Sequence, residues 1–213
     1  SAASDVYKRQ FYYESTGLVA NKTLDIVCGS STHTVAREDT VDFTLTIFLT
    51  GTQLLVKKGS GITGYKGLAG KRVGAAQGST NEKAIRDLNA EGKIKPEAQI
   101  VVYQEHSQGM LALQKGVVDA YCTDGILLAG LRAKAPNPED YELAGGLITY
   151  DPYAYIVREN DSDFRDFINI QIIAMIKDGR YRDLYYKWFG AKGAVPYPMT
   201  DEARILMKLQ AWP

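Results

Sequence analysis

Polar side chains that could bind an anion follow the first apolar run of the sequence. Ser30 and Thr32 carry hydroxyl groups, and Arg37 comes five residues after Thr32. A guanidinium group pairs with a carboxylate through two parallel hydrogen bonds, and the hydroxyl groups of a loop can add further bonds. This segment is therefore predicted to bind a carboxylate.

A second set of polar residues lies at two predicted strand-to-helix junctions. Ser79 and Thr80 follow Gly78, and Asp124 follows another apolar run. The N-terminus of a helix favours anions, whereas the carboxylate of Asp124 either caps its own helix or accepts an ammonium group. A buried ligand that carries both charges needs a partner for each, because an unpaired buried charge is very costly. Together the two sets suit a small zwitterion.

These residues must be positioned by a chain that alternates strands and helices. Strands are predicted over residues 24–28, 41–48, 54–56, 68–76, 100–103 and 117–122, with extended runs over 141–148 and 153–157. One of the helices between them begins with a Ser79–Glu82 capping box and stops at Gly92. Two final helices are predicted over 164–176, with one apolar stripe, and over 181–189. This pattern predicts an α/β fold with a largely parallel sheet, which binds ligands at the carboxyl ends of its strands.

The composition excludes several classes of protein. Of the 213 residues 45% are apolar, and 25 basic residues balance 25 acidic ones, so neither a nucleic-acid surface nor a polybasic membrane anchor is expected. No apolar stretch approaches the roughly 20 residues of a membrane span.

The cysteines and the start of the chain give three smaller predictions. Cys28 and Cys122 lie in apolar runs and are predicted to be buried free thiols, with a disulfide between them left open. The chain has no CxxC pair and no His/Cys cluster, so neither a metal site nor a cofactor is expected. The first ten residues, Ser1–Gln10, show no periodicity and are interpreted as non-native sequence.

The order and spacing of several segments resemble a known family, the polar amino-acid-binding proteins of ABC importers (bacterial solute-binding protein family 3). The resemblance runs from about Leu18 to about Gly190. It rests on residues 29–44, on 68–74 before 78–80, and on 116–120 followed by Asp124.

The resemblance implies a periplasmic-binding-protein-like fold of type II, in which two lobes, each a sheet flanked by helices, are joined by a two-strand hinge. Residues 1–53 and 148–213 would form lobe 1, and residues 54–147 would form lobe 2. The family begins with a longer lobe 1, so this chain is expected to lack the first part of that lobe. The implied protein is a monomer, periplasmic or else extracellular and tethered to a membrane, that closes on an amino acid and delivers it to the permease of an ABC importer.

The resemblance also assigns roles to residues. Arg37 would bind the α-carboxylate with help from Ser30, Thr32 and Thr80, and Asp124 would bind the ammonium group. The predicted ligand-binding residues are Ser30, Thr32, Arg37, Ser79, Thr80, His106 and Asp124.

His106 bears on the side chain of the ligand. Its surroundings resemble the glutamate/aspartate-binding branch, in which a histidine at this position faces the side-chain carboxylate. Otherwise His106 is an incidental loop residue, and His33 is expected at the surface or behind the site. The alternatives are a cyclohexadienyl dehydratase-like enzyme that uses His106 or a carboxylate as general acid, and the sensing domain of a receptor.

Overall fold

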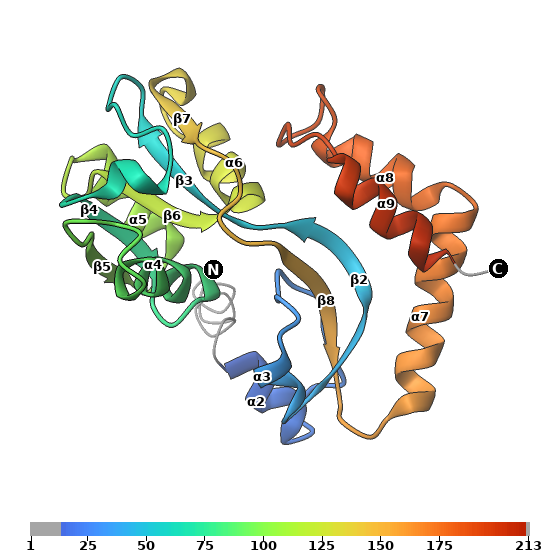
Figure 1. The fold of residues 1–213 in the computed structure, drawn as a ribbon. Coiled ribbons are helices and arrows are strands. Elements are labelled where there is room, and N and C mark those ends of the chain that lie inside the picture. Colours follow the sequence, from blue (N-terminus) through green and yellow to red (C-terminus); the bar gives the residue numbers. More distant parts are fainter. Residues whose placement is uncertain (1–13, 212–213) are drawn as a thin grey trace, which may run out of the picture. The chain divides into compact units, whose positions relative to one another are not determined.

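A computed structural model describes residues 14–211, and the predicted non-native segment Ser1–Gln10 lies outside the described residues. The chain forms two compact units. Unit 1 combines the residues up to Leu49 with those from Pro152 onward, and unit 2 is the continuous stretch Thr50–Asp151. Each unit contains a sheet flanked by helices, which confirms the predicted α/β fold class (Figure 1).

The sheet of unit 2 has five strands in the order β5-β4-β6-β3-β7. The strands are β3 (Thr52–Lys57), β4 (Arg72–Ala76), β5 (Gln99–Tyr103), β6 (Ala120–Asp124) and β7 (Tyr141–Ala144). β4 runs parallel to β5 and to β6, whereas β3 is antiparallel to both β6 and β7. Four strands therefore share one direction and β3 opposes them, so the sheet is mixed: two of its four pairings are parallel, as predicted, and the two that involve β3 are antiparallel.

The direction of the strands follows from their connections. Helices α4 (Thr80–Ala90), α5 (His106–Gln114) and α6 (Gly125–Ala133) lie between β4, β5, β6 and β7 in the sequence. A helical crossover returns the chain parallel to the strand it left. No α-helix separates β3 from β4, where the chain has only the short 3-10 turn Tyr65–Leu68. The direction of β3 is therefore not fixed by a helical crossover.

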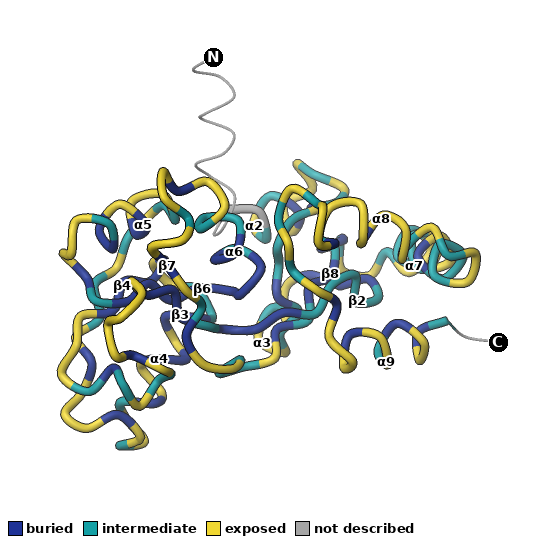
Figure 2. The backbone as a smooth tube through the Cα atoms, turned by 90° about the horizontal axis from the view of Figure 1, so that it is seen from above, coloured by how far each residue is buried: buried dark blue, intermediate teal, exposed yellow. Residues whose placement is uncertain are grey.

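Both faces of this sheet are covered by apolar side chains. Leu54 packs with Ile85 of α4, whereas its neighbour Leu55 packs with Leu128 of α6. Successive side chains of a strand point to opposite faces, so β3 contributes to two separate clusters. The central strands β4 and β6 are accordingly dark blue in Figure 2.

Helix α4 begins and ends at the predicted signals. Ser79 is its N-cap, and the hydroxyl of Ser79 accepts a hydrogen bond from the Glu82 amide at 3.1 Å. Gly92, two residues past the last helical residue, has φ +67°, a conformation that glycine adopts at little cost.

Unit 1 has a smaller sheet, in which β8 (Asp151–Val157) lies between β1 (Ile26–Val27) and β2 (Asp42–Thr50). Its helices are α2 (Glu14–Ala20), α3 (Val35–Glu38), α7 (Ser162–Lys177), α8 (Arg180–Phe189) and α9 (Asp201–Gln210). Figure 1 shows α7, α8 and α9 grouped beside β2. Side chains of α7 and α8 hold β2: Asn169 accepts from the Leu45 amide at 2.8 Å, and Tyr181 donates to the Ile47 carbonyl at 2.9 Å.

Three details of unit 1 differ from prediction. Helix α9 was not predicted at all, although Thr200 caps it by accepting from the Ala203 amide at 3.2 Å. The apolar stripe of α7 is only partly covered, since Ile172 is buried but Phe167 is 59% exposed. Cys28 is exposed, because β1 ends before it, whereas Cys122 is buried in β6, and both thiols are free.

Among residues 14–211, no helix combines the length and the apolar composition needed to cross a membrane.

Candidate functional site

The loop after β1 is held against β8 as an additional extended segment. The His33 amide donates to the Pro152 carbonyl at 2.8 Å, and the Ala154 amide donates to the Ser31 carbonyl at 3.1 Å. Thr32 lies between these two bonds, is buried, and forms an isolated bridge with Tyr153. Backbone pairing thus fixes the predicted ligand-binding residue Thr32, and the predicted residue Ser30 directly precedes the paired segment.

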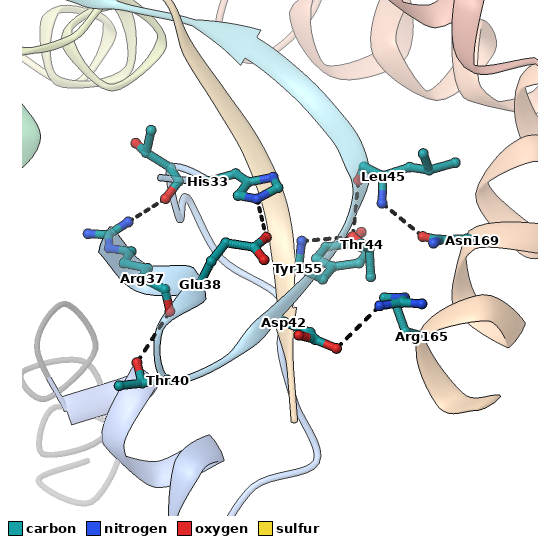
Figure 3. Close-up of polar contacts among 11 residues, drawn as sticks. His33, Arg37, Glu38, Thr40, Asp42, Thr44, Leu45, Tyr155, Arg165 and Asn169 are labelled. Carbon is teal, nitrogen blue, oxygen red and sulfur yellow. Dashed lines mark hydrogen bonds and ion pairs between the residues drawn. The ribbon is translucent and has the colours of Figure 1, made fainter. Parts of the chain in front are cut away.

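Arg37 points back toward this loop from the short helix α3. Its Nη1 donates to the Thr32 carbonyl at 2.6 Å, which places the guanidinium group beside the backbone of Thr32 (Figure 3). A guanidinium group has five N–H donors, and this bond uses one of them. The structure therefore brings Thr32 and Arg37 together within unit 1, and Ser30 lies two residues before Thr32 in the same loop.

His33 contacts two nearby side chains, Phe43 and Glu38. Its ring stacks on Phe43 with 4.4 Å between centroids, and its Nε2 contacts the carboxylate of Glu38 (Figure 3). About a third of the side chain remains exposed (34%).

Three predicted site residues of unit 2 lie at one edge of its sheet. Thr80 follows β4, His106 follows β5, and Asp124 ends β6. The three strands are neighbours and run parallel, so their carboxyl ends meet at the same edge. This is the edge at which open α/β sheets bind ligands.

Ser79 belongs to the same edge, but its hydroxyl group serves the helix. It donates to the Ala76 carbonyl at 2.8 Å and accepts from the Glu82 amide at 3.1 Å. The carboxylate of Glu82 reaches past Ser79 to the amide of Gly78, so the capping box is shifted by one residue from the predicted form.

Asp124 occupies the N-cap position of α6, yet its side chain makes no capping hydrogen bond to that helix. Its carboxylate is buried, with 4% of the residue exposed, and Oδ1 accepts from Nδ2 of Asn81 at 2.9 Å. The carboxylate of Asp124 therefore accepts from Asn81 and, contrary to one of the two sequence interpretations, does not cap α6.

Asp124 belongs to a network of buried and partly buried polar side chains that the sequence did not reveal. Asn81 also donates to the Thr52 hydroxyl at 2.9 Å. The hydroxyls of Thr52 and Thr149 are 2.8 Å apart, and the Thr149 hydroxyl donates to Asp151 at 2.6 Å. Each of these residues looks ordinary in the sequence, and only the fold brings them together.

His106 is the first residue of α5 and not, as predicted, a loop residue before it. Its Nδ1 is 2.8 Å from the phenol oxygen of the buried Tyr121. Burial lowers the pKa of His106 below its ordinary value, so the ring is neutral at neutral pH. Gly109 makes room for this pair, because a Cβ atom there would lie 2.0 Å from the Tyr121 ring.

Within the described part of the chain, no three His, Cys, Asp or Glu side chains are grouped so that they could hold a metal ion.

Comparison with known proteins relates this arrangement to a family. The family model of bacterial extracellular solute-binding proteins, family 3, matches residues 13–191. The L-glutamate/L-aspartate-binding protein of Pseudomonas aeruginosa is 33% identical over 195 residues, which cover 89% of this chain and 64% of that protein. The ABC transporter glutamine-binding protein GlnH of Bacillus subtilis is 34% identical over 172 residues, which cover 80% of this chain and 60% of GlnH.

A solved structure of an amino-acid-binding protein has a similar fold. An ancestral arginine-binding protein bound to arginine superimposes with a TM-score of 0.75 and 29% identity, covering 83% of this chain and 76% of that protein. The chain spans less than two thirds of the length of the Pseudomonas aeruginosa protein and of GlnH. From the matched residues 13–191 and the shared fold, the chain belongs to family 3 of the bacterial extracellular solute-binding proteins.

Proposed function

We propose that this protein binds a polar amino acid outside the cytoplasm and delivers it to the permease of an ABC importer. The observation that carries the proposal is the buried carboxylate of Asp124 at the same sheet edge as the N-terminus of α4. The first group is an acceptor for an ammonium ion, and the second favours a carboxylate. The named relatives bind glutamate, aspartate or glutamine, and the solved structure holds arginine. These ligands share the α-amino and α-carboxylate groups.

In this proposal Arg37 binds the α-carboxylate with Ser30, Thr32 and Thr80, and Asp124 binds the ammonium group. Ser79 acts through its backbone position, because its hydroxyl group is already used in the cap. The two sets come from different units. The hinge closure and the lobe limits 1–53, 54–147 and 148–213 inferred from the resemblance belong to the same proposal.

We further propose that the preferred ligand is acidic. His106 lies at the carboxyl edge of unit 2, and a neutral imidazole can donate one hydrogen bond to a side-chain carboxylate. The glutamate/aspartate-binding relative supports this choice, while GlnH, a relative of similar identity, carries the name of a different ligand.

Thermal unfolding of the purified protein tests both levels of the proposal. We expect L-glutamate and L-aspartate to raise Tm more than L-arginine or L-leucine do, because a ligand that binds only the folded state stabilises it. Equal shifts with arginine or leucine would remove the acidic preference, and no shift with any amino acid would refute the binding function.

Mass spectrometry of incubated ligand addresses the enzymatic alternative. We expect glutamate to be recovered unchanged after incubation with the protein. Conversion of an offered cyclohexadienyl acid would instead support a dehydratase.

A further inference from the structure

Asn81 is a buried amide at the centre of the polar network of unit 2. It is the second residue of α4, is 3% exposed, and directs its Nδ2 at two acceptors. These acceptors are Oδ1 of Asp124 and Oγ1 of Thr52, both at 2.9 Å. A carboxamide has two N–H groups, so each acceptor can receive one of them.

The orientation of this carboxamide is fixed by chemistry. An ionised carboxylate only accepts hydrogen bonds, so the NH₂ group and not the oxygen of Asn81 must face Asp124. The oxygen of Asn81 lies 3.4 Å from the hydroxyl of Thr123, which can donate to it. Reversing the amide would place its oxygen against the carboxylate of Asp124.

The second acceptor is itself held in place. Thr52 pairs with Asp124 in the register of β3 and β6, so their backbones are neighbours in the sheet. The Thr52 amide donates to Asp151 at 3.1 Å, and the hydroxyl of Thr149 bridges Thr52 and Asp151 at 2.8 and 2.6 Å. Asn81 is therefore anchored on one side and contacts Asp124 on the other.

We propose that Asn81 is the positioning residue of Asp124, which holds the carboxylate in the orientation that receives the ammonium group of the ligand. An aspartate at an N-cap would otherwise turn its side chain onto the amides of its own helix, which Asp124 does not do. A fully bonded buried network keeps its members in one geometry. This inference rests on the proposed amino-acid binding.

The test replaces Asn81 and a matched residue of the same helix. Asn89 also uses its carboxamide for two hydrogen bonds, which are partly buried, donating to the Ala98 carbonyl at 2.9 Å and accepting from the Ala98 amide at 3.0 Å. It lies at the other end of α4, away from the sheet edge with Asp124. Asn81→Leu and Asn89→Leu therefore both remove hydrogen bonds of a side-chain amide, but only the first removes one to Asp124.

Calorimetric titration with L-glutamate gives the first readout. We expect Asn81→Leu to raise Kd by about tenfold or more and Asn89→Leu by less than about threefold, with comparable losses of Tm. If Asn81→Leu does not fold, Asn81→Ser, which removes the amide without adding an apolar side chain, is expected to show the same increase.

Competition by glutarate, which has both carboxylates but no amino group, gives the second readout. We expect the inhibition constant of glutarate to change by less than about threefold in Asn81→Leu, because the lost interaction concerns the ammonium group. Equal weakening of glutamate and glutarate, or an unchanged affinity for glutamate, would overturn the positioning role. If the wild type binds glutamate, the proposed function stands whatever Asn81→Leu shows. If the wild type binds no amino acid, both the proposed function and the positioning role of Asn81 are refuted.

Discussion

Arg37 is the residue at which ligand binding and folding should separate most clearly. Its guanidinium group is bonded within unit 1 to the carbonyl of Thr32, a contact whose loss costs about 1 kcal/mol. Loss of its charged hydrogen bonds to a carboxylate costs about 2 kcal/mol or more, or roughly 30-fold in Kd. We expect calorimetry of Arg37→Ala to show this loss with little change in Tm.

The control for this substitution is Arg182→Ala. Arg182 is exposed and bonds to its neighbour Asp183, so its removal should leave both Kd and Tm unchanged. Full affinity in Arg37→Ala would contradict the role of Arg37 in ligand binding.

His106 predicts a proton linkage to ligand binding. Burial lowers the pKa of His106 in the free protein, and an adjacent ligand carboxylate would raise it in the complex. The complex would then take up a proton, so affinity rises as pH falls between these two pKa values, by at most about tenfold per pH unit.

Calorimetry between about pH 7.5 and pH 5.5, around the ordinary pKa of histidine, checks the linkage. We expect L-glutamate to bind more tightly at the lower pH and L-glutamine to change less, since its amide carries no charge. Identical pH profiles for the two ligands would argue against contact between His106 and a ligand carboxylate.

The residues of the site differ in how far the sequence could predict them. The structure places Thr80 and Asp124 at one sheet edge, as expected from strand-to-helix junctions that are local in sequence. The network that includes Asp124 was missed, because Thr52 and Asp151 are 99 positions apart and meet only in the folded unit. Nothing in their local sequence marks either of them as a partner of Asn81.

Two helix glycines of unit 2 should respond oppositely to alanine. In α5, a Cβ atom at Gly109 would lie 2.0 Å from the ring of Tyr121, whereas in α6 nothing lies within 4 Å of such an atom at Gly130. We expect urea unfolding to show Gly109→Ala destabilised by about 1–3 kcal/mol and Gly130→Ala stabilised by up to about 1 kcal/mol. Stabilisation of both variants would show that helix propensity, and not contact with Tyr121, decides the outcome at Gly109.

Prediction of whole elements succeeded where the signals were local. The Ser79 cap and the Gly92 stop of α4 depend on backbone groups within one turn, and both were found. Helix α9 was missed after the proline-rich stretch before it, although Thr200 and two acidic residues of its first turn are local signals. The exposure of Cys28 was not predictable, because it depends on β1 being only two residues long.

At the scale of the molecule, unit 2 should fold by itself. It is one continuous stretch, Thr50–Asp151, and it contains apolar clusters on both faces of its sheet as well as both ends of the Thr52–Asp151 contact. We expect this fragment to unfold cooperatively on heating, with an enthalpy of about 60–80 kcal/mol for a domain of this size. A circular dichroism spectrum typical of a disordered chain would show that unit 2 depends on unit 1.

The whole architecture was predictable only in part. Strand–helix alternation gave the parallel strands of unit 2, but the reversed β3 between β6 and β7 could not be predicted, because strand order depends on contacts between distant segments. Unit 1 is discontinuous in sequence, so no local pattern places β8 between β1 and β2.

The unequal exposure of the two thiols makes the protein suited to site-specific labelling. Cys122 is fully buried and burial raises its pKa, so it offers almost no thiolate to a reagent. Cys28 is exposed and only two residues from Ser30, although partial burial raises its pKa as well. A maleimide dye should therefore attach once per chain, two residues before Ser30, and a fluorescent reporter of ligand binding could be made from the unaltered sequence.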